Sequence, residues 1–135
     1  MNDATTAAAG ETLTRAKLLA RAEALVETVR ARSAETEQLR RLPPETMAEM
    51  RAANMHRILQ PKAHGGAGAH FSGMVDIVET ISQGCCAAGW CLTQYCSHNC
   101  LLGYWPAEGQ ADVWRDKPDA MVAGSLIPGC GTARK

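Results

Sequence analysis

The sequence lacks an excess of either charge: its 135 residues include 14 lysines and arginines and 14 aspartates and glutamates, so the formal net charge is zero. A nucleic-acid-binding domain needs a basic excess on one face, and this balance argues against such a function. No run approaches the ~18 apolar residues of a membrane span. The first residues have neither the basic nor the apolar region of a secretory signal. These absences favour one globular, cytoplasmic domain that acts on neither nucleic acid nor membrane.

The cysteines are concentrated rather than spread along the chain. Five of the six lie between Cys85 and Cys100, and two of these are adjacent, whereas disulfide scaffolds space their cysteines so that bridges close loops. A metal site is the sharper alternative, because Cys96, His98 and Cys100 are close in sequence. On a helix, however, Cys96 and Cys100 share a face from which His98 points away. We predict small buried hydrophobic residues, with a Cys/His metal or redox module as the alternative.

Apolar periodicity predicts an all-α fold. Residues 1–10 are unpatterned and predict a disordered tail. From about residue 11, helical spacing predicts a first helix that runs to Leu39 or Leu42, before Pro43 ends it. Pro44 suits the first position of a second, short helix. The candidate core positions of this region are Met47, Met50 and Met55.

The next segment is predicted to be extended and then to form a loop. Arg57–Gln60 leads into Pro61, and a glycine-rich loop follows over residues 64–70. This loop lacks the third glycine of a dinucleotide fingerprint and the Gly-Lys-Ser/Thr of a P-loop. His64 and His70 could flank a ligand there, although loop histidines are usually solvated.

Three more helices are expected after the loop. Ser72 is a plausible N-cap for the first, Gly84 ends it or marks a close contact, and its predicted inward face is Val75, Val78 and Ile81. The second, from about Ala87 to Leu102, is apolar almost all round and is expected to be buried between other elements. Pro106 starts the last, which ends near Trp114.

The chain is expected to change character after residue 118. Ala120–Ile127 is typical of a strand or an extended segment, yet the sequence offers no partner strand. We therefore expect either pairing with another chain or a longer protein. The predicted organisation is a helical domain over residues 11–118 and the start of a truncated β domain over residues 119–135.

Four short motifs occur in an order and spacing that resemble one known family. They are Pro61-x-x-x-Gly65-Gly66, Gly89-Trp90 with His98 eight residues later, Pro106-Ala107-Glu108-Gly109-Gln110-x-x-x-Trp114, and Ala123-Gly124-Ser125-x-x-Pro128. Together they resemble the acyl-CoA dehydrogenase-like flavoprotein superfamily. The resemblance covers about residues 15–131 and is closest to the oxygenase components of two-component flavin-dependent monooxygenases, of the p-hydroxyphenylacetate hydroxylase type.

This resemblance implies a fold and an activity. Such proteins have an N-terminal helical domain, a middle β domain and a C-terminal helical bundle through which subunits form dimers or tetramers. The chain would supply the first domain and the opening of the second. The oxygenases take reduced FMN or FAD from a separate flavin reductase and hydroxylate a phenolic or other aromatic substrate through a flavin hydroperoxide. The fragment alone is expected to be inactive. The alternatives are part of an acyl-CoA dehydrogenase-type oxidoreductase and a non-catalytic helical interaction module.

Three site residues follow from the same resemblance. Trp90 matches the tryptophan that lies against the flavin ring, where an aromatic face suits stacking. His98 matches the histidine that contacts the substrate phenol and can take or hold its proton. Ser125 matches a small hydroxyl residue near the reactive part of the flavin, which implies both a cofactor-binding and a catalytic role. No metal ligand is implied.

Overall fold

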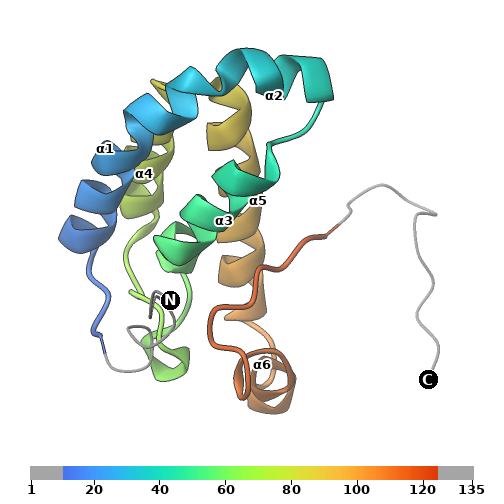
Figure 1. The fold of residues 1–135 in the computed structure, drawn as a ribbon. Helices are drawn as coiled ribbons and strands as arrows, with labels where there is room; N and C mark the ends of the chain where they lie inside the picture. The colour runs from blue at the N-terminus through green and yellow to red at the C-terminus, as the bar shows by residue number, and fades with distance from the viewer. Residues whose placement is uncertain (1–10, 125–135) are drawn as a thin grey trace, which may run out of the picture.

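Eight helical elements make up residues 11–124, the part of the chain that the computed structural model describes (Figure 1). In chain order they are α1 (Arg15–Ala31), α2 (Ser33–Leu39), α3 (Pro44–Ala52), η1 (Met55–Arg57), η2 (Lys62–His64), α4 (Phe71–Ser82), α5 (Cys86–Leu102) and α6 (Ala107–Trp114). The described residues contain no strand, and the predicted all-α class is confirmed. Residues 120–124 of the predicted extended segment are irregular. The rest of that segment and the predicted tail, residues 1–10, lie outside the described residues.

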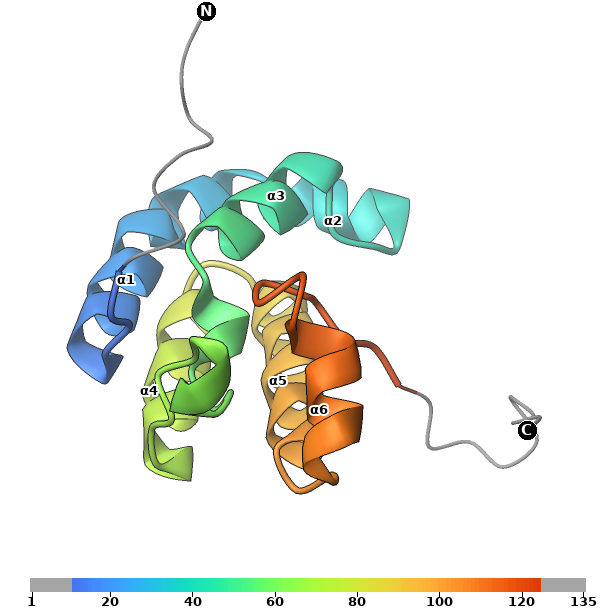
Figure 2. The ribbon, with the colours of Figure 1, turned by 90° about the horizontal axis from the view of Figure 1, so that it is seen from below.

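α4 and α5 lie side by side at the centre of the fold, as Figures 1 and 2 both show. α1 packs along α4, and α6 lies beside the end of α5 (Figure 2). The core lies between these helices and η1, where Leu18, Met55, Ile58, Ile77 and Leu92 are almost completely buried. Each such side chain contributes about 1.5–3 kcal/mol relative to an exposed one.

The first predicted helix is two helices. α1 begins after Thr14, whose hydroxyl accepts a hydrogen bond from the Lys17 amide at 3.3 Å, and ends before Arg32. α2 then continues to Leu39 and stops at Arg40, which has the left-handed φ of 52°. The guanidinium of Arg32 binds both carboxylate oxygens of Glu49 on α3 at 2.8 and 2.9 Å. This bidentate ion pair therefore holds the break between α1 and α2 against α3.

α3 and α6 begin where their prolines predict. Pro44 is the first residue of α3, and Pro106 immediately precedes α6. Met50 and Met55 are buried, and Met47 packs against the core at its edge, as expected. The segment before Pro61 is not extended, however. Arg57 ends η1, residues 58–60 form bends, and η2 follows directly after Pro61. In both short helices, backbone amides donate to the carbonyl oxygen three residues earlier.

α4 differs from its prediction at its start and on its inward face. The N-cap is His70, not Ser72: the His70 imidazole Nδ1 accepts a hydrogen bond from the Ser72 amide at 3.4 Å. The helix is also rotated relative to expectation. Met74, Ile77 and Ile81 are buried, Val78 is half-buried, and Val75 is 48% exposed. Residues 74, 77 and 81 and residues 75, 78 and 81 both have the spacing of one helical face, so the apolar periodicity did not distinguish between the two faces.

Two glycines let the central helices approach closely. A Cβ at Gly89 on α5 would overlap the Ser82 hydroxyl at the end of α4. A Cβ at Gly84, in the turn between these helices, would lie 2.5 Å from the Val26 carbonyl oxygen on α1. The predicted close contact at Gly84 is confirmed, and α4 ends two residues before it.

Replacing Gly84 by Ala is expected to lower the free energy of unfolding by about 1–3 kcal/mol, the usual cost of overpacking. Neither Gly84 nor its control Gly73 has a left-handed φ, so the effect is steric rather than a backbone penalty. A Cβ at Gly73 would lie 3.3 Å from the flexible Arg15 side chain and 3.4 Å from the Ala69 Cβ, with no backbone atom among its nearest neighbours, so Gly73→Ala should cost much less. Urea unfolding measures both variants. Equal stabilities for the two would contradict the proposed contact.

Candidate functional site

A pocket of about 240 Å³ lies between one face of α5 and the irregular segment after α6. Its lining residues are Trp90, Cys91, Gln94, Tyr95, His98, Ala123 and Gly124. Two of the three predicted site residues, Trp90 and His98, therefore share one pocket. The third, Ser125, lies outside the described residues, and its neighbour Gly124 closes the pocket opposite α5.

Trp90 presents its indole to solvent. The residue lies in the second turn of α5 and is 67% exposed, although the helix buries the adjacent Gly89. An exposed aromatic side chain of this size offers a flat apolar face on which a planar ring can stack. The expectation that α5 is buried all round is not met within residues 11–124, because Cys86, Trp90 and Leu101 on this helix are exposed.

His98 lies two turns further along the same face and is half-buried. Its Nδ1 atom is buried and has no hydrogen-bond partner in the described part of the chain. The next residue, Asn99, is completely buried and donates its side-chain amide to the His56 carbonyl oxygen on η1 at 2.9 Å. This hydrogen bond fixes α5 against the core, and thereby directs His98 to the pocket side of the helix.

The cysteines of α5 do not surround His98 as a metal site would. Cys85 and Cys96 are buried as predicted, Cys91 and Cys100 are half-buried, and Cys86 is exposed, contrary to the prediction. Burial raises the pKa of Cys96 to about 12, and its thiol donates to the Met55 carbonyl oxygen. Because metals bind the thiolate, this geometry disfavours Cys96 as a ligand. No group of three potential ligands occurs within residues 11–124.

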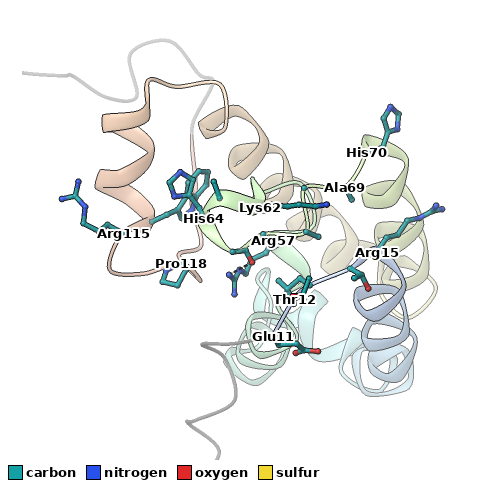
Figure 3. Close-up of a pocket in the computed structure, with 18 residues that line it drawn as sticks. Glu11, Thr12, Arg15, Arg57, Lys62, His64, Ala69, His70, Arg115 and Pro118 are labelled. Atoms are coloured by element: carbon teal, nitrogen blue, oxygen red, sulfur yellow. Dashed lines mark hydrogen bonds between the residues drawn. The ribbon is translucent and has the colours of Figure 1, made fainter.

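A second pocket, of about 930 Å³, lies at the glycine-rich loop (Figure 3). His64 and His70 both line it, as predicted for ligand-flanking residues, but they lie toward opposite sides of the loop. The His64 ring packs on Trp114 with centroids 5.0 Å apart, and the exposed His70 caps α4. Arg57, which the sequence did not single out, lies in the wall between them (Figure 3).

The backbone amides of the loop and two nitrogens of Arg57 in this second pocket form hydrogen bonds within the fold itself. The amides of Gly66, Ala67 and Gly68 donate to carbonyl oxygens of residues 57–61 at 2.9–3.1 Å, so they do not form a phosphate cradle. Arg57 is 5% exposed, and burial lowers the pKa of its guanidinium. It donates to Asn54 Oδ1 at 3.1 Å and to the Gly65 carbonyl oxygen at 2.7 Å. Arg57 thus holds two left-handed turns together.

Residues 12–112 match the acyl-CoA dehydrogenase N-terminal domain family. The chain belongs to this family. It contains no helix long and apolar enough to cross a membrane within the described residues.

Several relatives of this acyl-CoA dehydrogenase N-terminal domain are hydroxylases. The chain is 34% identical over 112 residues to the FADH(2)-dependent resorcinol hydroxylase oxygenase component of Rhizobium sp. (strain MTP-10005), covering 83% of this chain and 27% of that protein. It is 29% identical over 99 residues to the p-hydroxyphenylacetate 3-hydroxylase oxygenase component of Acinetobacter baumannii, covering 73% and 24%. The chain thus spans about a quarter of the length of these relatives.

A solved structure has the same arrangement of helices. The crystal structure of 3-HSA hydroxylase from Rhodococcus sp. RHA1 superimposes with a TM-score of 0.73 and 33% sequence identity, over 76% of this chain and 27% of that one. The expected superfamily is therefore confirmed from sequence and from structure, with homologues among flavin-dependent oxygenase components.

The irregular segment that closes the α5 pocket is anchored by buried polar groups of the acyl-CoA dehydrogenase N-terminal domain. Gln60 donates to the Pro118 carbonyl oxygen at 2.8 Å, and His56 Nε2 lies 3.1 Å from the Asp119 carbonyl oxygen. The Asp119 carboxylate accepts from Arg51 at 3.0 Å. These contacts lead the chain back across α5 to Gly124. They join residues more than fifty positions apart, and no local sequence pattern predicts them.

Acidification should weaken this anchor. Burial lowers the pKa of His56 to about 4, so the folded protein keeps its imidazole neutral while the unfolded chain takes up a proton near pH 6.5. Stability is therefore lost as the pH falls from 6.5 towards 4, by up to about 3 kcal/mol. Urea unfolding between pH 7 and pH 5, above the carboxylate range, measures this slope.

His56→Gln keeps an amide donor for the Asp119 carbonyl oxygen but cannot titrate, so its stability should change little over the same pH range. The exposed His70 provides a matched control, and His70→Gln should keep the slope of the unaltered protein. A slope that persists in His56→Gln would contradict this assignment.

Proposed function

We propose that the chain is part of the oxygenase component of a two-component, reduced-flavin-dependent monooxygenase that hydroxylates a phenolic or other aromatic substrate. The observation that carries this proposal is the shared pocket of Trp90 and His98 on α5. An exposed aromatic plate and an imidazole, about two helical turns apart, suit a planar cofactor and a proton-bearing substrate. The similarity to hydroxylase oxygenase components supports the same reading.

The residues of the pocket fit a flavin ring. The exposed indole of Trp90 offers a stacking face, and the small residues Ala123 and Gly124 opposite leave room for a flat group to approach. Ser125 follows immediately, and we propose that its hydroxyl donates a hydrogen bond to the cofactor. Reduced FMN and FAD share this ring system. When bound, the reduced flavin would supply the chemistry that activates oxygen.

His98 is proposed to handle the proton of the substrate. An imidazole exchanges protons near neutral pH, and a group that takes up the phenolic proton makes the aromatic ring more nucleophilic. Nδ1 of His98 is buried, so Nε2 is the atom that the pocket can use. We propose that Nε2 accepts or holds this proton while α5 keeps the ring in place.

The proposal extends to partners and organisation. Residues 11–118 would form the helical domain, and residues 119–135 would open the β domain of a longer oxygenase. A flavin reductase would supply the reduced flavin, the enzyme would be a cytoplasmic homo-oligomer, and these 135 residues alone would be inactive. The matched region is about a quarter of the hydroxylase relatives, which supports a site completed by other segments.

A chimaeric enzyme tests the role of His98. The N-terminal part of the Rhizobium resorcinol hydroxylase oxygenase component is replaced by the matching part of this chain, and the product formed per flavin oxidised is measured with resorcinol. His98→Ala should lower hydroxylation by about 10²–10⁴-fold, the usual contribution of acid–base catalysis, while flavin oxidation continues and releases hydrogen peroxide.

The control for this experiment is His70→Ala, which removes an exposed histidine outside the α5 pocket and should leave the product yield unchanged. An unchanged yield in His98→Ala would show that His98 serves packing only.

A further inference from the structure

Gly124 lies directly against the imidazole ring of His98. A Cβ built on Gly124 would be 2.9 Å from Nε2, 3.1 Å from Cδ2 and 3.4 Å from Cε1 of His98. Both residues line the α5 pocket, one from the helix and one from the returning segment. The backbone of Gly124 therefore meets the edge of the ring that carries Nε2.

The need for glycine at this position is steric. Among the described residues, left-handed glycines occur at Gly65 and Gly68, and Gly124 is not one of them. Its backbone conformation is therefore open to any residue. Carbon atoms in good contact lie about 3.5–4.0 Å apart, so a methyl group at position 124 would force the ring or the segment to move.

The ring of His98 packs closely against the returning segment at Gly124. Nδ1 of His98 is buried and has no hydrogen-bond partner within residues 11–124. Within this part of the chain, Nδ1 thus lacks the polar contact that usually fixes the tautomer and orientation of a functional histidine. The contact with Gly124 is the close restraint on the Nε2 side.

We infer that Gly124 is the positioning residue of His98: because it has no side chain, it sets where the imidazole lies and leaves Nε2 open to the pocket. The effect of this positioning on catalysis rests on the proposed function. In that reaction the phenolic O–H bond breaks and a new N–H bond forms at Nε2. Small displacements of a reacting group lower its effectiveness steeply, so the atom must be held in place.

The first test uses this chain with Gly124→Ala. The imidazole resonances of His98 are followed by NMR, and the modification of each histidine by diethyl pyrocarbonate is followed by mass spectrometry. The added methyl group should shift the His98 resonances and slow modification at His98 several-fold, because it covers Nε2. His64 and His70 lie outside the pocket and act as internal controls. Ala120→Ser, in the same segment but not in the pocket, should change neither readout.

The second test remains decisive even if Gly124→Ala is poorly stable. The melting temperatures of Gly124→Ala, His98→Ala and the double variant form a double-mutant cycle. If the methyl group clashes with the imidazole, it should lower the melting temperature only where His98 is present. Equal losses in both backgrounds, or unchanged His98 signals in a folded Gly124→Ala protein, would overturn the inference. Neither readout requires flavin or substrate, so failure of the proposed function would be seen separately, as a chimaera without hydroxylation.

Discussion

The close approach of Gly89 on α5 to Ser82 on α4 fixes the rotation of α5 about its own axis. Each residue of an α-helix advances by about 100°, so His98 lies on the side opposite Gly89. Trp90 lies about a quarter-turn around the helix axis from His98. Further along the helix, Cys96 and Asn99 bond to carbonyl oxygens of η1 and hold the same orientation. The residues that the helix can offer to a ligand are therefore decided by the residues that it must bury.

A second constraint brings the other wall of the pocket into place. The chain leaves α6 and returns across α5 because buried groups of η1 and its neighbours hold Pro118 and Asp119. This return places Gly124 against His98. The α5 pocket is thus a product of two separate contacts with the same core region, around residues 55–60.

Most of the local structure and part of the candidate site could be predicted from the sequence. Short-range sequence patterns correctly predicted where the helices at Pro44 and Pro106 start and where α5 lies. They also predicted the buried methionines. Trp90 and His98 could be placed on one helix from sequence, and the structure brings both to one pocket. The proposed roles came only from the family resemblance, because an exposed tryptophan and a half-buried histidine have no distinctive local pattern.

The predictions that failed have different physical origins. His70 caps α4 through a local bond to the Ser72 amide that a histidine rarely makes, and η1 and η2 are held by bonds between residues three apart. The rotation of α4 reflects a choice between two similar apolar faces. Arg57 was missed because its partners are an asparagine oxygen and a backbone carbonyl oxygen in two turns, and not an acidic residue of opposite charge. The outcome at Ser125 lies outside the described residues.

An NMR titration of the isotopically labelled chain with anaerobically reduced FMN at millimolar concentration tests directly whether the α5 pocket faces the flavin. Its three tryptophans report on different places: Trp90 on the α5 pocket, Trp114 on the glycine-loop pocket and Trp105 on the exposed turn before α6. We expect the signals of the Trp90 indole and the Gly124 amide to shift together and to saturate, while those of Trp105 and Trp114 stay in place. Shifts confined to Trp114, or none at Trp90, would contradict the assignment of the α5 pocket as the flavin-facing site.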